Sequence, residues 1–376
     1  MKELIPITIF SMVMVFLSHT YSGYDPVECR YQRKERLFYT IMSIGLIVYC
    51  GLRTSYNDTH TYLFGYKMLS KESNLFQEID WLKIGDNPGF VFAQGIMLEL
   101  DFSSQSFLMA FSVFTVGVNL WFFRKYSCNL WLTVLIFITY AGYIFNMAAI
   151  KQCTAMAFCL IATDRAIQKK YIRFALYVLL GCLFHPYALM YVVVPFLFFK
   201  PWSRGTLIML FVFGLMGFCM QTLLGTLLNV TDMLGENYDA SSFSGEGVNP
   251  VRLLVTAIPV ILSIPVMYRI ESDEQEDQYA IVNLAMLNAE IMFVALFGTA
   301  NYFARLANYF IPFQAVSIPW LLKQYGYDEK RTMTTLAVIG YLLFFIYSQS
   351  IHEVFDQHYA AVPLWDYLQT LFKGVF

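Results

Sequence analysis

The sequence predicts an all-α integral membrane protein that crosses the bilayer many times. Of its 376 residues, 58% are hydrophobic and only 14% are charged. A soluble domain of this size has too little interior to hide so much apolar surface, so lipid must be the solvent. Aromatic residues make up 18% of the chain, and Tyr favours the boundary between lipid and water. No linker or internal repeat divides the sequence, so we expect one membrane domain over residues 1–376.

The first apolar segment, residues 4–24, predicts an uncleaved membrane helix rather than a signal peptide. Its leading end carries only Lys2 and Glu3, whereas its trailing end meets the basic run RYQRKER at 30–36. Because basic residues concentrate in cytoplasmic loops, this asymmetry favours an outer N-terminus and a cytoplasmic segment at 25–36. The further apolar segments cover residues 37–52, 104–122, 130–147, 148–163, 173–199, 205–228, 251–268, 279–298, 305–322 and 332–349.

The segment 173–199 decides the topology. As one helix it would place the basic run KPWSRG, residues 200–205, outside the cell. As a hairpin of two short helices that turns at His185-Pro186, it returns this run to the cytoplasm. Pro186 favours the hairpin because proline has no backbone N–H and interrupts helices. The hairpin also places most of the 25 Lys and Arg residues in inside loops, so we predict it, with about twelve membrane segments.

This topology places four features on the extracytoplasmic side. They are a long loop at 53–103, the turn at His185, a polar loop at 229–250 and the C-terminal tail from residue 350. The long loop contains NPGFVFAQGIMLELD, residues 87–101, which predicts a helix in the membrane interface. The inner connections are short and leave little room for an active site. Any chemistry is therefore expected on the outer side.

Four basic residues stand at predicted outer ends of membrane helices: Arg53, Lys151, Arg252 and Arg305. A charge deep in lipid costs on the order of 3 kcal/mol or more, so these side chains face protein or water. One interpretation is that each reaches the phosphates of the outer lipid leaflet. The alternative is a shared site, because each has polar neighbours, such as Gln152 beside Lys151. Four cations around one opening would suit a ligand with several negative charges, such as a diphosphate.

His185 and Asp58 are the candidate general bases. His185 lies at a helix break on the side that carries the cations, and the ordinary pKa of histidine, about 6.5, suits a base. Its alternative role is to cap the turn. Asp58 competes for the same role, although pairing with Arg53 would lower its pKa. Tyr62 and Tyr309 are candidates for a lid and a sugar-stacking surface.

We expect no metal and no cofactor. The tail motif HEVFDQH, residues 352–358, matches no metal-ligand spacing and favours a surface helix. The outer side carries no DxD motif, and the seven cysteines form no CxxC pair and are interpreted as small core residues. The absence of a basic stripe excludes a nucleic-acid partner.

Five motifs occur in an order that is typical of one membrane family. GLRTSYNDTHTYLFGY at 51–66 and DNPGFVFAQGIMLEL at 86–100 come first. AAIKQCTAMAFCLIA at 148–162, CLFHPYALMYVVVPF at 182–196 and RLANYFIPFQAVSIPWLL at 305–322 follow. Together they resemble the GLR…GDT…Y, PGF, IRQ…A, HPSAL and Arg-Tyr-Phe motifs of the EpsG family, membrane proteins of bacterial exopolysaccharide and capsule clusters.

The resemblance implies a Wzy-type polymerase. Such an enzyme joins oligosaccharide repeat units carried on undecaprenyl diphosphate, at the outer face of the bacterial inner membrane. The implied partners are these lipid-linked oligosaccharides and membrane lipid, and a chain-length regulator and a flippase are candidates. Two positions depart from the family pattern, Asn57 in place of Gly and Lys151 in place of Arg. Asn accepts a left-handed backbone, and Lys keeps the charge but loses bidentate phosphate recognition.

On this interpretation the cations hold the diphosphate leaving group. His185 is the first choice for the base that takes the proton of the acceptor hydroxyl, and Asp58 is the second. One alternative is a transferase similar to O-antigen ligase, which would move finished glycan and need the same groups. The other is a non-enzymatic transporter of lipid-linked sugars. A transporter should carry polar residues near the bilayer midplane and on both sides, whereas the candidate residues here gather at outer helix ends.

Overall fold

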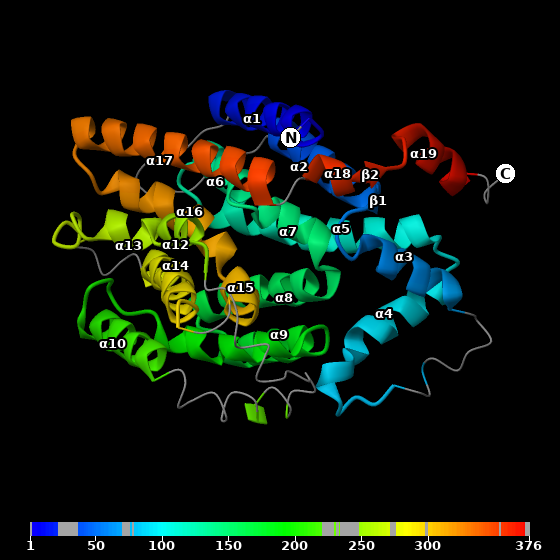
Figure 1. Cartoon of the computed structure of the whole chain (residues 1–376), viewed down its shortest axis with the longest axis horizontal. Coiled ribbons are helices and arrows are strands. Elements are labelled where there is room, and N and C mark those ends of the chain that lie inside the picture. The colour runs from blue at the N-terminus through cyan, green and yellow to red at the C-terminus, as the bar shows by residue number, and fades with distance from the viewer. Residues whose placement is uncertain are drawn as a thin grey trace.

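The computed structural model confirms an all-α protein, in which most helices run in similar directions across the molecule (Figure 1). It describes residues 2–21, 37–69, 76, 79–219, 229–230, 233, 248–270, 276–297, 300–352 and 355–372. The predicted cytoplasmic segment at 25–36 and most of the polar loop at 229–250 lie outside these residues. The fold is therefore described from the helices that surround those segments.

The N-terminal half combines long helices with short helices, one 3-10 turn and one short strand. It contains α1 (Leu4–Tyr21), α2 (Leu37–Gly51), β1 (Arg53–Ser55), α3 (Thr59–Met68), the 3-10 turn η1 (Ile84–Asp86), α4 (Pro88–Glu99), α5 (Ser104–Tyr126), α6 (Leu130–Thr139), α7 (Gly142–Ala148) and α8 (Ile150–Ile167). The remainder contains α9 (Tyr171–Cys182), the 3-10 helix η2 (Pro186–Phe196), α10 (Arg204–Phe218), α12 (Pro250–Thr256), α13 (Ile258–Ser263), α14 (Glu276–Val294), α15 (Ala300–Asn308), α16 (Ile311–Lys323), α17 (Tyr327–Tyr347), η5 (Ser348–His352), α18 (Phe355–His358), β2 (Ala360–Ala361) and α19 (Leu364–Phe372).

The length and composition of the described helices bear on the predicted number of membrane spans. Within the described residues, two helices are long and apolar enough to cross a membrane, α5 and the helix at Tyr327–Ser350. The pair α6 and α7, bent by 49°, makes a third if it counts as one span. Shorter apolar helices of 10–17 residues accompany them. The predicted total of about twelve is not confirmed, because many apolar runs fold into short or broken helices.

Two of these breaks have local causes that hydropathy does not reveal. The run 130–147 bends where Ala141 takes a left-handed backbone conformation, with φ of 66°. The run 305–322 divides into α15 and α16. Pro312 stands in the first turn of α16 and has no N–H to donate to the carbonyl of Asn308, so α15 ends at that residue.

The helix break predicted at His185-Pro186 is confirmed. α9 ends at Cys182, η2 begins at Pro186, and the two arms pack against each other. The predicted helix of the long loop, α4, holds this turn, since the N–H of Gly89 donates to the carbonyl of Leu183 at 2.8 Å. A Cβ at Gly89 would lie 2.8 Å from the Cβ of Leu183, so this close approach requires glycine.

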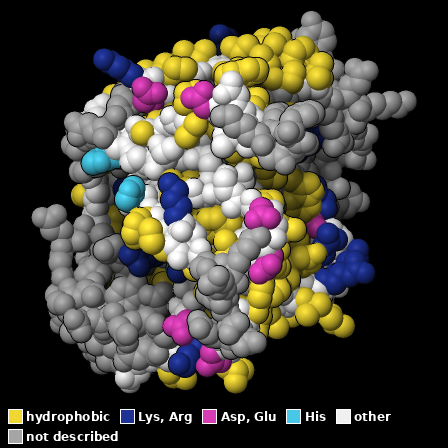
Figure 2. Space-filling view, turned by 90° about the vertical axis from the view of Figure 1, so that its right-hand side faces the viewer, with side chains coloured by type: hydrophobic (Ala, Val, Ile, Leu, Met, Phe, Trp, Pro, Cys, Tyr) yellow, Lys and Arg dark blue, Asp and Glu magenta, His cyan; other side chains and the backbone are white. Residues whose placement is uncertain are grey.

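Elements from the long loop and from the C-terminal tail meet at one end of the molecule, on the right in Figure 1. β1 pairs with β2 in an antiparallel ladder, and the N–H of Val362 donates to the carbonyl of Leu52 at 2.9 Å. Figure 2 views this end and shows Lys, Arg, Asp, Glu and His side chains among hydrophobic ones. The described parts of the long loop and of the C-terminal tail therefore share one end of the molecule, where scattered charged side chains are exposed.

The opposite ends of α5 and α8 carry basic residues predicted for the inner loops. The carboxylate of Asp164 is fully buried there and forms an ion pair with Lys125. It also accepts hydrogen bonds from the hydroxyl of Tyr126 at 2.7 Å and from Nε2 of Gln168 at 2.8 Å. This network joins the two helices at the end of the molecule opposite the one viewed in Figure 2.

Candidate active site

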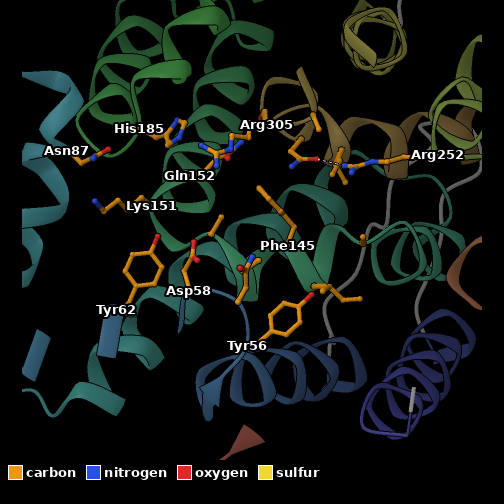
Figure 3. A pocket seen from close by; sticks show the side chains of 18 residues that line it. Tyr56, Asp58, Tyr62, Asn87, Phe145, Lys151, Gln152, His185, Arg252 and Arg305 are labelled. Atoms are coloured by element: carbon orange, nitrogen blue, oxygen red, sulfur yellow. Dashed lines mark hydrogen bonds between the residues drawn. The ribbon is translucent and has the colours of Figure 1, made fainter. Parts of the chain in front are cut away.

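A polar cavity of about 520 Å³ lies among helix ends that come from distant parts of the chain. The start of α3, the junction of α7 and α8, the turn before η2, the start of α12 and the end of α15 all contribute to it (Figure 3). The lining residues are Tyr56, Asn57, Asp58, Tyr62, Asn87, Ala141, Ile144, Phe145, Ala148, Ala149, Lys151, Gln152, His185, Arg252, Ala304, Arg305, Asn308 and Ile311.

Most of the candidate residues from the sequence meet in this cavity. Those that line it are Asp58, Tyr62, Lys151, Gln152, His185, Arg252 and Arg305, whereas Arg53 and Tyr309 do not. The lining thus combines three cations with a carboxylate, an imidazole and the phenols of Tyr56 and Tyr62. Such a set can bind a ligand with several negative charges and can move a proton.

The start of α3 supplies one wall. Asn57 has φ of 46°, which confirms the expected left-handed turn, and Asp58 follows at the N-cap with no capping bond from its side chain. Tyr62 lies one turn further and points toward the same space (Figure 3). Burial, and then the nearby charge of Asp58, raise the pKa of Tyr62 to about 12. Its phenol therefore stays protonated at neutral pH and can donate a hydrogen bond.

The start of α8 faces that wall. The Nζ atom of Lys151 lies 5.1 Å from the ring centroid of Phe90 on α4, within the range of a cation–π contact. Gln152 is 4% exposed, and its Nε2 donates to the carbonyl of Arg305 at 2.6 Å. This bond fixes the end of α15 against α8. Figure 3 shows Gln152, Arg305 and His185 close together at one side of the cavity.

Arg252 enters from the start of α12. Asn249 caps this helix, since its Oδ1 accepts from the N–H of Val251 at 2.9 Å. The Nη2 of Arg252 donates to Oδ1 of Asn308 at 3.0 Å. The sequence analysis did not select Asn308. Its position three residues after Arg305 places both on one face of a helix, which is the signal that would have found it.

His185 lies in the turn between α9 and η2, outside both helices. Burial, and then the charges of Arg305 and Lys151, lower its pKa to about 3, so the imidazole is neutral at neutral pH. Its Nδ1 lies 3.0 Å from the hydroxyl oxygen of Tyr309. Tyr309 is fully buried behind the cavity, and its carbonyl accepts from the hydroxyl of Tyr191 at 2.8 Å. Tyr309 thus contacts His185 and does not form part of the cavity wall.

Arg53 is 1% exposed and points away from the cavity. Its Nη1 donates to the carbonyl of Cys50 at 2.5 Å and to Oγ of Ser112 at 3.3 Å, and its Nε donates to Oγ1 of Thr59 at 3.1 Å. These bonds join α2, α3 and α5. Arg53 therefore stabilises the turn that carries Asp58. It does not line the cavity, although its charge predicted a direct contact with the ligand.

A model of the EpsG family matches residues 36–363, which is most of the chain. The chain belongs to the EpsG family. Members of this family are Wzy-type polymerases, so membership indicates a membrane polysaccharide polymerase and suggests lipid-linked oligosaccharides as substrates. A search of curated proteins and a search of solved structures each found no match.

The described part of this EpsG protein has no group of three His, Cys, Asp or Glu side chains placed to hold a metal ion. The charged and titratable groups of the cavity are Asp58, Lys151, His185, Arg252 and Arg305, with the phenols of Tyr56 and Tyr62. These side chains can bind anionic groups and move a proton.

Proposed function

We propose that this protein joins oligosaccharide repeat units carried on undecaprenyl diphosphate, at the outer face of the bacterial inner membrane. The observation that carries the proposal is the cavity that brings Lys151, Arg252 and Arg305 together with His185 and Asp58. The donor is a growing glycan on the lipid diphosphate. The acceptor is a hydroxyl of the next lipid-linked unit.

The cations stabilise the departure of the diphosphate. The acceptor oxygen forms a bond to the anomeric carbon, and the bond from that carbon to the diphosphate oxygen breaks. The electron pair of the broken bond leaves with the diphosphate, so negative charge develops on that oxygen. This charge is compensated by the three cations that line the cavity, Lys151, Arg252 and Arg305. A leaving group that is compensated in this way needs no acid catalyst.

The hydrogen bond between Tyr309 and His185 favours Asp58 as the base. A buried hydroxyl needs an acceptor for its proton, and Nδ1 of His185 is the partner of this hydroxyl among the described residues. If Tyr309 donates, Nδ1 carries no proton, and Nε2 of the neutral ring carries one. His185 then presents an N–H donor to the cavity. A neutral imidazole in this tautomer stabilises a developing phosphate charge and takes no proton.

Asp58 takes the proton of the acceptor hydroxyl in this mechanism. It lines the same cavity as His185, and its side chain makes no capping bond to α3. The sequence analysis preferred His185 as the base because of the ordinary pKa of histidine. The contact with Tyr309, which the sequence did not reveal, supports the reverse assignment.

The test is a reaction with purified protein in lipid nanodiscs and synthetic repeat units on undecaprenyl diphosphate. We expect a ladder of products that differ by one repeat unit, and we expect Arg305→Ala to abolish it. Arg173→Ala is the matched control, because Arg173 is exposed on α9 and does not line the cavity. A single transfer without a ladder would favour a ligase, and transbilayer movement without bond formation would favour a transporter. Either outcome would overturn the proposal.

A further inference from the structure

Helix α15 separates the polar cavity from a second cavity that is apolar. Arg305 and Asn308 line the polar cavity, whereas Phe303 and Leu306 line the apolar one. Since successive residues of a helix are rotated by about 100°, these two pairs lie on opposite sides of α15. Phe310, just after the helix, continues the apolar wall. One short helix therefore contributes polar side chains to one cavity and hydrophobic side chains to the other.

The apolar cavity has a volume of about 190 Å³ and is lined by hydrophobic side chains alone. Met190 and Val193 of η2 and Met216 of α10 form part of its wall. Val193 is 41% exposed, so the cavity opens on the flank of the helix bundle. Its neighbour Val192 is 55% exposed on the same helix and does not line the cavity. In a membrane protein, a flank of exposed valines faces lipid.

The two cavities also share the hairpin arm that begins at Pro186. His185 lines the polar cavity, and Met190 and Val193 follow it along η2 by five and eight residues. At the rise of a 3-10 helix, these positions are about 10 and 16 Å beyond His185. A chain attached to a diphosphate at Arg305 meets this apolar space within a few isoprene units. A bilayer lipid can fill the space, but only a lipid diphosphate binds on both sides of α15, with its diphosphate at the cations and its chain in the apolar cavity.

We propose that the apolar cavity beside α15 binds the part of the polyprenyl chain nearest to the diphosphate of the donor. This inference rests on the proposed function, because it takes a polyprenyl diphosphate as the substrate. Met190 and Met216 suit the methyl-branched chain, since the flexible thioether side chain adapts to irregular apolar shapes. Val193 stands at the mouth through which the rest of the chain leaves for the bilayer.

The first test fills the cavity and varies the length of the lipid. Val193→Trp narrows the mouth, and Val192→Trp is the control on the same helix. Each variant is assayed with the same repeat unit on undecaprenyl diphosphate and on a short diphosphate of two isoprene units. We expect Val193→Trp to raise the KM for the long substrate about tenfold, because one good apolar contact is lost. The KM for the short substrate should stay within about twofold of the wild-type value. Val192→Trp should change neither.

Equal effects on both substrates, or equal effects of both variants, would overturn the inference. If the wild type makes polymer and Val193→Trp is normal with both lipids, the polyprenyl site is refuted and the proposed function stands. If the wild type makes no polymer, the proposed function fails, and the second test decides the site by itself.

The second test uses the wild-type protein and needs neither turnover nor a variant. Undecaprenyl phosphate with a photoreactive diazirine in its first isoprene units is bound in nanodiscs and irradiated, and the labelled peptides are identified by mass spectrometry. We expect adducts on the peptides that contain Met190 and Met216, with competition by undecaprenyl diphosphate and not by phosphatidylglycerol. Adducts elsewhere, or equal competition by phosphatidylglycerol, would assign the cavity to bulk lipid and refute the inference.

Discussion

The assignment of Asp58 as base and His185 as donor predicts opposite outcomes for two conservative substitutions. Asp58→Asn keeps the size of the side chain and removes its ability to take a proton. His185→Gln removes the imidazole and keeps an N–H group close to the position of Nε2. If Asp58 is the base, the asparagine variant is nearly inactive and the glutamine variant retains much of its activity.

The size of each effect follows from the contacts. The loss of a general base lowers the rate roughly 10²- to 10⁴-fold. His185→Gln weakens the contact of 3.0 Å with Tyr309, and one neutral hydrogen bond is worth about 1 kcal/mol, or roughly a fivefold change in rate. His185→Ala also removes the hydrogen-bond donor to the charged phosphate. This loss should raise the activation free energy by about 1.5–3 kcal/mol, which lowers the rate roughly 10- to 150-fold.

The assay is single-turnover joining of two lipid-linked repeat units, followed by separation of the products on a gel. Thermal unfolding in detergent provides the control for folding, and rates are compared per folded molecule. The reasoning is wrong if His185→Gln is as inactive as Asp58→Asn, or if Asp58→Asn reacts at close to the wild-type rate. Either result would return the base role to His185.

Four other predictions follow from named contacts. The pKa of His185 is lowered to about 3 in the folded protein and stays near 6.5 in the unfolded chain. The unfolded state therefore binds the extra proton first, and the wild type should lose about 1.4 kcal/mol of stability per pH unit between pH values of about 6.5 and about 3. His185→Gln should lose less, as measured by thermal unfolding at two pH values. Arg53→Ala leaves buried acceptors unpaired and should lower the unfolding free energy by about 3 kcal/mol, measured by thermal unfolding. Asp164→Asn breaks a buried ion pair far from the cavity and should cost about 3 kcal/mol of stability, with the rate per folded molecule unchanged. Gly89→Ala should destabilise by about 1–3 kcal/mol, whereas Gly65→Ala, with open space around it, should not; equal melting temperatures would contradict this.

Much of the candidate site could be predicted because its residues carry local signals. A charge at the end of an apolar run, as at Lys151, Arg252 and Arg305, marks a helix end near water or protein. A proline after a polar residue in an apolar run, as at His185-Pro186, marks a helix break. These signals need only a few neighbouring residues. The structure gathers all four positions around one cavity.

The rest depends on partners that are distant in the sequence. Arg53 looks like Arg305 by its position at a helix end, but Ser112 and Thr59 satisfy its guanidinium in the interior. The sequence predicts a stacking role for Tyr309. In the structure its hydroxyl instead contacts His185, which lies more than a hundred residues earlier in the chain. The span count is not confirmed for a similar reason, since the bend at Ala141 depends on a single left-handed residue within a uniformly apolar run. Hydropathy carries no information about such contacts.

The elements η2 and α15 explain why the two cavities belong to one site. Each contributes to both, η2 through its N-cap His185 and through Met190, and α15 through Arg305 and Phe303. They are joined in the interior, because the hydroxyl of Tyr191 in η2 donates to the carbonyl of Tyr309, just after α15, at 2.8 Å. A shift of one element would therefore move groups in both cavities together. A lipid whose chain occupies the apolar cavity would hold η2 and α15 in the positions that set His185 and Arg305 around the diphosphate, so binding energy from the chain would contribute to alignment at the reacting bond.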